Sequence, residues 1–253
     1  MFDELLRLEA LSKYFGGVLA LDQVDLRVGR GEVVALVGDN AAGKSTLARV
    51  VGGVHQPSGG RVFVEGQAVS IDRPRTATAL GIASVFQESS LVENLDVTAN
   101  VFLGQEIRRR GLLDMYAMTV AARHHLGTLS ARIPDLRVPL RELSAGQRQC
   151  VAIARTLVSD PRLVVLDEPT ASLSVSQTAE VLTYVDGLRD QGLGVILISH
   201  NLADVRAVAD RIEVLRHGRN NGSFAAGEAS YEGLLAAITG ATRTSRPDWA
   251  GPN

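Results

Sequence analysis

Short apolar runs alternate with amphipathic stretches along most of the chain. Residues 24–37 predict a strand, a turn at Gly29–Gly31 and a second, wholly apolar strand at Val33–Val37, and a helix is expected over Thr46–Val51. Two further strand and helix pairs follow, 163–166 with 177–191 and 195–198 with 202–209. Strands that alternate with helices predict an α/β fold, in which a parallel sheet carries helices on both faces.

Two regions depart from this alternation. Gly59–Gly60 and the residues 61–65 predict a turn and a short strand in an antiparallel arrangement. Between residues 92 and 155 the β-branched alternation fades, and amphipathic stretches such as 118–132 favour helices. We expect a helical subdomain inserted at about 88–155.

The expected domain organisation is simple. One domain covers 1–240, and 241–253 form a disordered tail, because this end holds prolines and few apolar residues. No apolar run reaches the roughly 18 to 20 residues that cross a bilayer, so any membrane role is expected to act through a partner.

Composition narrows the classes of partner. The chain has 26 basic and 28 acidic residues, a net charge of -2, so it lacks the basic excess expected of a nucleic-acid-binding protein. Cys150 stands alone, which favours a reducing cytoplasmic setting and a buried apolar role for its side chain. We interpret Arg108–Arg110 as a solvated loop, with contact to lipid head groups or to a partner as the alternative.

A glycine-rich stretch joins the strand at 33–37 to the following helix. It matches the pattern G-x-x-x-x-G-K-S/T, and its residues are Gly38, Asp39, Asn40, Ala41, Ala42, Gly43, Lys44, Ser45 and Thr46. Backbone amides and the helix N-terminus direct positive charge at phosphates, Lys44 can reach the β and γ oxygens, and the Ser45 hydroxyl can bind Mg²⁺. The stretch therefore predicts a loop that binds a nucleotide triphosphate.

Two adjacent carboxylates end the strand at 163–166. Asp167 and Glu168 are expected at the carboxyl edge of the sheet, where α/β proteins bind ligands. Asp167 suits the Mg²⁺ shell, usually through a water. Glu168 is positioned to orient or deprotonate the water that attacks the γ-phosphate.

The run Leu143-Ser144-Ala145-Gly146-Gln147, upstream of the acidic strand, looks like the signature sequence of the ATP-binding cassette (ABC) family. The resemblance covers residues from about 5 to 240. It implies a P-loop NTPase core with a parallel sheet, an antiparallel β subdomain and a helical subdomain. It also implies an ATPase that uses ATP and Mg²⁺.

Three further residues match this family in the expected order. Gln87 matches the glutamine that touches magnesium and the attacking water and leads toward membrane subunits. His200 matches the histidine that contacts the γ-phosphate. Phe15 matches the aromatic residue that stacks on adenine, with Tyr14 as the neighbouring possibility.

The resemblance also implies a dimer. In this family two cassettes enclose two nucleotides head to tail, so Ser144, Gly146 and Gln147 of one chain are expected to meet the γ-phosphate held by the Lys44 loop of the other. A helix N-terminus facing an anion is the physical basis of that contact. A homodimer, or a heterodimer with a related cassette, is expected.

Three positions differ from the usual family pattern. Ala41 and Ala145 replace glycines, and Ser174 stands where aspartate is common. Alanine disfavours positive φ, so both alanines are tolerable unless the backbone must be left-handed there. Ser174 lacks the carboxylate that helps to couple the two sites.

Within the family, single-cassette members of ribose- and fructose-type import systems are most similar, on the residues around the phosphate loop and on 168–173, 198–202 and 208–212. This likeness implies import of a simple sugar through separate permease subunits, with a secreted sugar-binding protein and a peripheral location at the cytoplasmic face of the inner membrane. The alternatives are a cassette for export or lipid trafficking, and a soluble cassette in DNA maintenance or translation. No residue is expected to touch a sugar, so the substrate rests on likeness alone.

Overall fold

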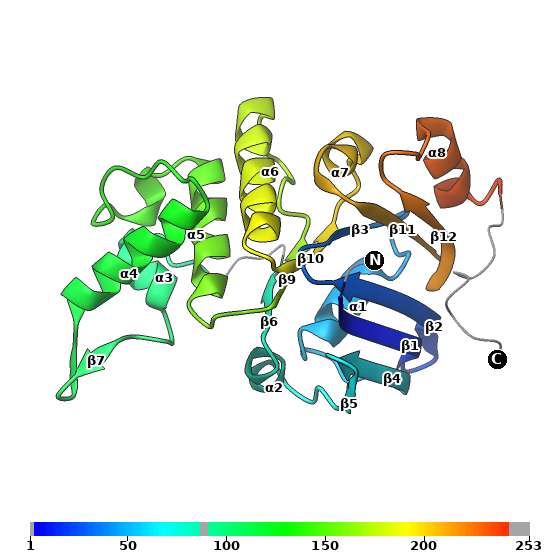
Figure 1. Cartoon of the computed structure of the whole chain (residues 1–253), viewed down its shortest axis with the longest axis horizontal. Helices are drawn as coiled ribbons and strands as arrows, with labels where there is room; N and C mark the ends of the chain where they lie inside the picture. Colours follow the sequence, from blue (N-terminus) through cyan, green and yellow to red (C-terminus); the bar gives the residue numbers. More distant parts are fainter. Residues whose placement is uncertain (1–2, 87–90, 243–253) are drawn as a thin grey trace.

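A six-stranded sheet forms the centre of the molecule in the computed structural model, which describes residues 3–86 and 91–242 (Figure 1). The strand order is β12-β11-β3-β10-β9-β6; the first five strands from the β6 edge run parallel, and β12 joins β11 antiparallel. The strands are β3 (Val33–Val37), β6 (Ile82–Val85), β9 (Leu163–Asp167), β10 (Gly194–Ile198), β11 (Arg211–Arg216) and β12 (Arg219–Ala225). The expected α/β class is confirmed.

The central strands are buried on both faces, as their continuous apolar sequences predict. Because side chains alternate along a strand, Val33 and Val195 pack with helices α5 (Ala145–Leu157) and α6 (Val175–Asp190). Their neighbours Val34 and Ile196 pack on the opposite face, in one core with α1 (Lys44–Val51). Helices α7 (Leu202–Val208) and α8 (Tyr231–Thr239) pack with β3 and β11, and the short α2 (Pro74–Ala79) precedes β6.

A second, antiparallel sheet completes the core around α1. Its order is β2-β1-β4-β5, with β1 (Glu4–Phe15), β2 (Val18–Gly29), β4 (Gly59–Val64) and β5 (Gln67–Val69). The sequence pattern predicted β4 and the end of β2, but it missed β1. Register shifts interrupt the pairing of β1 with β2 at four places, so β1 does not show a regular two-residue alternation.

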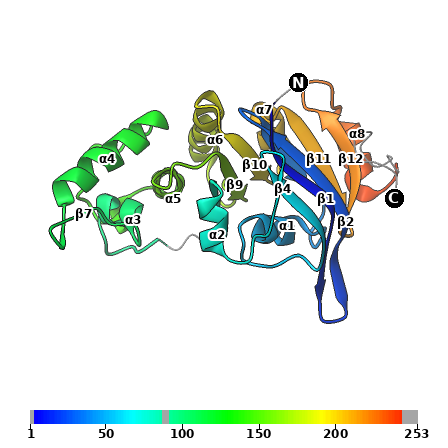
Figure 2. The same cartoon turned by 60° about the horizontal axis from the view of Figure 1, so that its bottom comes forward.

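A helical region stands beside the sheets, at the left of Figures 1 and 2. It comprises α3 (Val97–Phe102), a hairpin of β7 (Arg108–Arg109) and β8 (Leu112–Leu113), α4 (Met115–Thr128), the 3-10 turn Leu140–Glu142 and α5. Met118 and Leu126 of α4 are buried in the same core as Val151 of α5.

The prediction of a loop at Arg108–Arg110 is wrong, because Arg108 and Arg109 form β7, which pairs antiparallel with β8. Arg110 and Gly111 both have positive φ, 52° and 85°, which is the backbone of a two-residue hairpin turn. The three arginines are exposed, as expected.

Cys150 is buried on α5, and burial raises the pKa of its thiol to about 12.

Of the expected tail 241–253, residues 243–253 lie outside the described residues. None of the helices in the described ranges is long and apolar enough to cross a membrane.

Candidate functional site

The loop between β3 and α1 follows a path that requires glycine at two positions. A Cβ on Gly38 would lie 2.2 Å from the Leu215 carbonyl oxygen, and a Cβ on Gly43 would lie 2.8 Å from the Ala20 carbonyl oxygen. Gly43 also has a φ of 102°. The two glycines of the motif are therefore required by close packing of the loop against neighbouring backbone.

Lys44 is the first residue of α1 and is buried inside the loop. Its Nζ donates to the carbonyl oxygens of Gly38 at 2.9 Å and Asp39 at 3.0 Å. The ammonium group and the N-terminus of α1 thus lie together, which is the arrangement that binds a phosphate.

Ser45 and Asp167 meet behind the loop. Ser45 Oγ donates to Asp167 Oδ1 at 3.2 Å, which joins α1 to the end of β9. Burial raises the pKa of the Asp167 carboxyl, and the hydrogen bond from Ser45 opposes this rise. A hydroxyl oxygen and a carboxylate oxygen at this separation fit a Mg²⁺ shell completed by nucleotide oxygens and water. Within the ranges 3–86 and 91–242, no group of three or more His, Cys, Asp or Glu forms a metal cage.

Glu168 follows directly after β9, and His200 lies two residues after the end of the neighbouring strand β10. His200 Nδ1 lies 2.8 Å from Glu168 Oε2. Glu168 has a φ of 54°, and its N–H donates to the Ile198 carbonyl at 3.0 Å. A left-handed backbone is unfavourable for glutamate, so the sheet edge holds this residue in a strained conformation.

Lys44, Ser45, Glu168 and His200 line one cleft of about 560 Å³, whereas Asp167 does not line it. Its lining includes residues 40–46, Glu168, Ala171 and His200, and the residues 18–20 at the start of β2 form an apolar wall. Sequence reasoning missed 18–20, because nothing in their local pattern marks them as part of a site.

Phe15 does not line this cleft. Its ring meets the His55 ring edge to face at a centroid distance of 5.0 Å, and Lys13 Nζ lies 5.0 Å from the Phe15 centroid. Phe15 pairs with Val18, the first residue of the apolar wall, in the β1–β2 hairpin. Tyr14 is exposed beside it. Gln87 lies outside the described residues.

The signature residues lie at the start of α5 and do not line the Lys44 cleft. Ser144 Oγ accepts from the Gln147 N–H at 3.1 Å, and Gln147 Oε1 accepts from the Ser144 N–H at 3.0 Å, which is a capping box. A Cβ on Gly146 would lie 3.0 Å from Glu180 Oε2, so glycine allows α5 to approach α6 closely.

The three departures from the family pattern have different consequences. Ala41 has a φ of 64°, so this alanine does occupy a left-handed position. Ala145 lies in the first turn of α5 with an ordinary helical backbone. Ser174 caps α6 by accepting from the Gln177 N–H, a role that aspartate would also fill.

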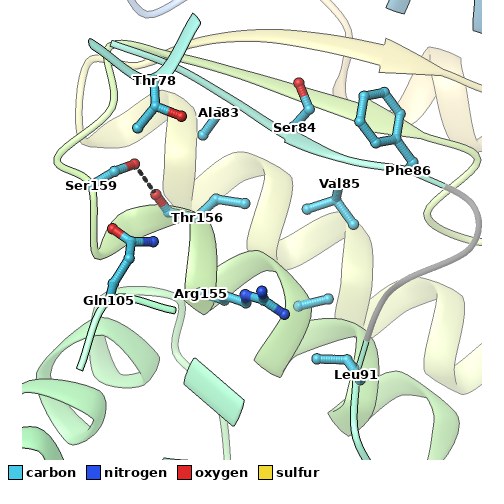
Figure 3. Close-up of a pocket in the computed structure, with 11 residues that line it drawn as sticks. Thr78, Ala83, Ser84, Val85, Phe86, Leu91, Gln105, Arg155, Thr156 and Ser159 are labelled. Carbon is cyan, nitrogen blue, oxygen red and sulfur yellow. Dashed lines mark hydrogen bonds between the residues drawn. The ribbon is translucent and has the colours of Figure 1, made fainter. Parts of the chain in front are cut away.

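A second cleft of about 300 Å³ lies between β6 and α5 (Figure 3). Phe86 and Ser84 line it from the sheet side, and Leu91 and Gln105 from the segments that enter and follow α3. Arg155 and Thr156 contribute from α5. The cleft therefore lies where the sheet meets the helical region.

Comparison with known proteins agrees with this geometry. The family model described as ABC transporter matches residues 21–171. The ribose import ATP-binding protein RbsA 1 of Streptomyces avermitilis is 41% identical over 91% of this chain, which spans only 44% of that relative. The xylose/arabinose import ATP-binding protein XylG of Sulfolobus acidocaldarius is 41% identical, over 85% of this chain and 86% of the relative.

Solved structures lead to the same family. The ADP conformation of the ATP-binding cassette MJ1267 has a TM-score of 0.78 and 27% identity, over 93% of this chain and 95% of that one. The cassette MJ0796, described as a dimer in a post-hydrolysis state bound to ADP and Pi, has a TM-score of 0.74 and 25% identity. The match covers 88% of this chain and 99% of that one. The enzyme class expected from the sequence, an ABC transporter ATPase, is the class of this family. The chain therefore belongs to the ABC transporter family, as an ATP-binding cassette.

Proposed function

We propose that this cassette hydrolyses ATP to energise import of a simple sugar through separate permease subunits. The observation that carries the ATPase part is the Glu168–His200 pair at the mouth of the Lys44 cleft. Glu168 accepts the proton of the attacking water, Lys44 neutralises phosphate charge, and His200 contacts the γ-phosphate. The bond from the γ phosphorus to the bridging oxygen breaks, giving ADP and phosphate.

Ser45 and Asp167 would hold Mg²⁺, which neutralises the charge that develops on the phosphates. Gln87 is proposed to contribute to the same shell and to contact the attacking water. Phe15 is proposed to stack on adenine, because its half-exposed ring lies next to the apolar wall at 18–20.

A second copy of the chain completes the site. Ser144, Gly146 and Gln147 lie outside the Lys44 cleft, so they reach a γ-phosphate only when it is held by another cassette. The dimer described for the MJ0796 cassette supports this arrangement. A homodimer is proposed.

Permease subunits are proposed to dock in the cleft of Figure 3, at the cytoplasmic face of the inner membrane. This cleft joins the sheet to the helical region, so a segment bound there would move when the two parts rearrange. CbiO1 from Clostridium perfringens, described as part of the ABC transporter complex cbiONQ, has a TM-score of 0.78 with this chain at 27% identity. A secreted sugar-binding protein would deliver the substrate on the other side.

The sugar assignment rests on relatives whose names specify ribose, xylose and arabinose import. The test is reconstitution of the cassette with its permease and binding protein in proteoliposomes, and measurement of phosphate release across a sugar panel. Stimulation by one pentose, absent in the Glu168→Gln variant, supports sugar import. Stimulation by lipids or export substrates alone would favour the export alternative.

A further inference from the structure

The β7–β8 hairpin lies at the end of the helical region farthest from β12 (Figures 1 and 2). Its arginines and leucines are exposed. We define the hairpin surface as Arg108–Leu113 with Met115 and Tyr116. Leu112 is 76% exposed and Tyr116 is 81% exposed, and Leu113 and Met115 beside them are exposed as well. Exposed apolar side chains that gather in one place mark interaction sites.

The positive charge of the hairpin surface is only partly neutralised: the charge of Arg108 interacts with the Glu106 carboxylate. Among the residues that the structure describes, no ion pair involves Arg108, Arg109 or Arg110. Over residues 104–123 there are four arginines and two acids, and both acids accept backbone N–H groups: Glu106 from Gly104 and Asp114 from Ala117, each at 3.0 Å.

The hairpin is held firmly at its base. The Asp114 N–H donates to the Ile107 carbonyl at 2.8 Å, and the Ile107 side chain packs against the core of the helical region. Asp114 also caps α4, which fixes the first turn that carries Met115 and Tyr116. The exposed side chains are therefore presented on a rigid support.

We propose that the hairpin surface binds anionic lipid head groups at the bilayer surface. Guanidinium groups bind phosphate in a bidentate manner, and exposed leucine and tyrosine side chains enter the interfacial layer. The hairpin surface has eight residues, whereas a stable protein interface takes roughly 20 to 30 residues from each side. A lipid surface needs no such number of residues, because affinity accumulates from individual charges and apolar groups.

The position of the hairpin relative to the permease cleft agrees with this role. Gln105 lines that cleft and lies three residues before Arg108. A permease docked in the cleft would bring the hairpin surface near the membrane. Only this orientation rests on the proposed function; the lipid contact itself does not.

The test is co-sedimentation of the full chain with vesicles of phosphatidylcholine alone, or of equal parts phosphatidylcholine and phosphatidylglycerol. We expect binding to the anionic vesicles only, and weaker binding as salt rises. The triple variant Arg108→Gln, Arg109→Gln, Arg110→Gln should lower the partition coefficient roughly one-hundredfold, at about fivefold for each arginine. The double variant Leu112→Ser, Leu113→Ser should also bind less, with the arginines intact.

The matched control removes the same charge elsewhere, at the exposed residues Arg61, Arg75 and Arg206. It should change binding only a few-fold, and all variants should retain ATP hydrolysis in vesicle-free buffer.

Equal losses in both triple variants, or equal binding to the two vesicle types, would overturn the proposal. So would loss of permease co-purification in detergent without any loss of vesicle binding, because the partner would then be a protein. A lipid-binding cassette that no sugar stimulates would contradict only the proposed import function.

Discussion

His200 Nδ1 and Glu168 Oε2 lie 2.8 Å apart, although 32 residues separate them in the chain. A proton on Nδ1 is donated to the carboxylate, and the exposed imidazole lines the cleft. The histidine thus orients the glutamate and remains able to contact a phosphate.

Glu168→Gln should bind ATP and lose most turnover, because an amide cannot accept the proton of the attacking water. A loss of about 10² to 10⁴ in phosphate release is expected for a general base. The variant should also accumulate an ATP-dependent dimer on gel filtration. The exposed Glu142→Gln is the matched control, and undiminished hydrolysis in Glu168→Gln would remove the residue from its assigned role.

Lys44→Ala should weaken ATP binding, since it removes a charge-assisted contact to the phosphates. The structure supports this result, because Lys44 Nζ is held by loop carbonyls inside the cleft. Calorimetry on Lys44→Ala and on the unmodified protein checks it. Equal affinities would show that the loop binds nucleotide without the ammonium group.

Ala41→Gly should stabilise the protein by about 1 kcal/mol, because glycine adopts the left-handed backbone of this position without strain. Ala42→Gly is the matched control: Ala42 is buried with an ordinary backbone, so the loss of its methyl group should destabilise by roughly 1 kcal/mol. Urea unfolding measures both variants. If both variants changed the free energy of unfolding in the same direction, the left-handed backbone of Ala41 would not be the cause.

The titration of Glu213 should lower the free energy of unfolding as pH rises above the ordinary glutamate pKa. Burial raises the pKa of this fully buried carboxyl, and the nearby Arg211 opposes the rise. Within the described residues, its Oε2 has no hydrogen-bond partner, while Oε1 accepts from Ser223 at 2.8 Å. Above the ordinary glutamate pKa the unfolded chain loses this proton first, so stability falls until the folded pKa is passed.

Glu213→Gln removes that titration. The stability difference, variant minus unmodified protein, should therefore shift in favour of the variant as pH rises from about 4.5 toward neutrality. Urea unfolding across this range gives the comparison, with the exposed Glu228→Gln as control. Parallel profiles for Glu213→Gln and the unmodified protein would show that the carboxyl titrates alike in both states.

The phosphate loop and the acidic pair could be predicted from sequence because each is a local unit. Strand, glycine-rich loop and helix follow one another within residues 33–51, so the motif itself specifies how Lys44 meets the N-terminus of α1. Asp167 and Glu168 are delivered by one buried apolar strand to the sheet edge. The α/β class followed in the same way, from apolar runs whose period is visible along the chain.

Only the tertiary structure decided what depends on residues far apart. The Glu168–His200 contact needs β9 and β10 to be neighbours, the wall at 18–20 needs β2 to begin beside the phosphate loop, and Ala41 has its left-handed φ within that loop. The antiparallel pairing of β7 with β8 depends on a two-residue turn, which the run of three arginines in the sequence does not indicate. Local pattern encodes which face of an element is apolar, whereas strand order and loop closure arise from long-range packing that no short stretch of sequence contains.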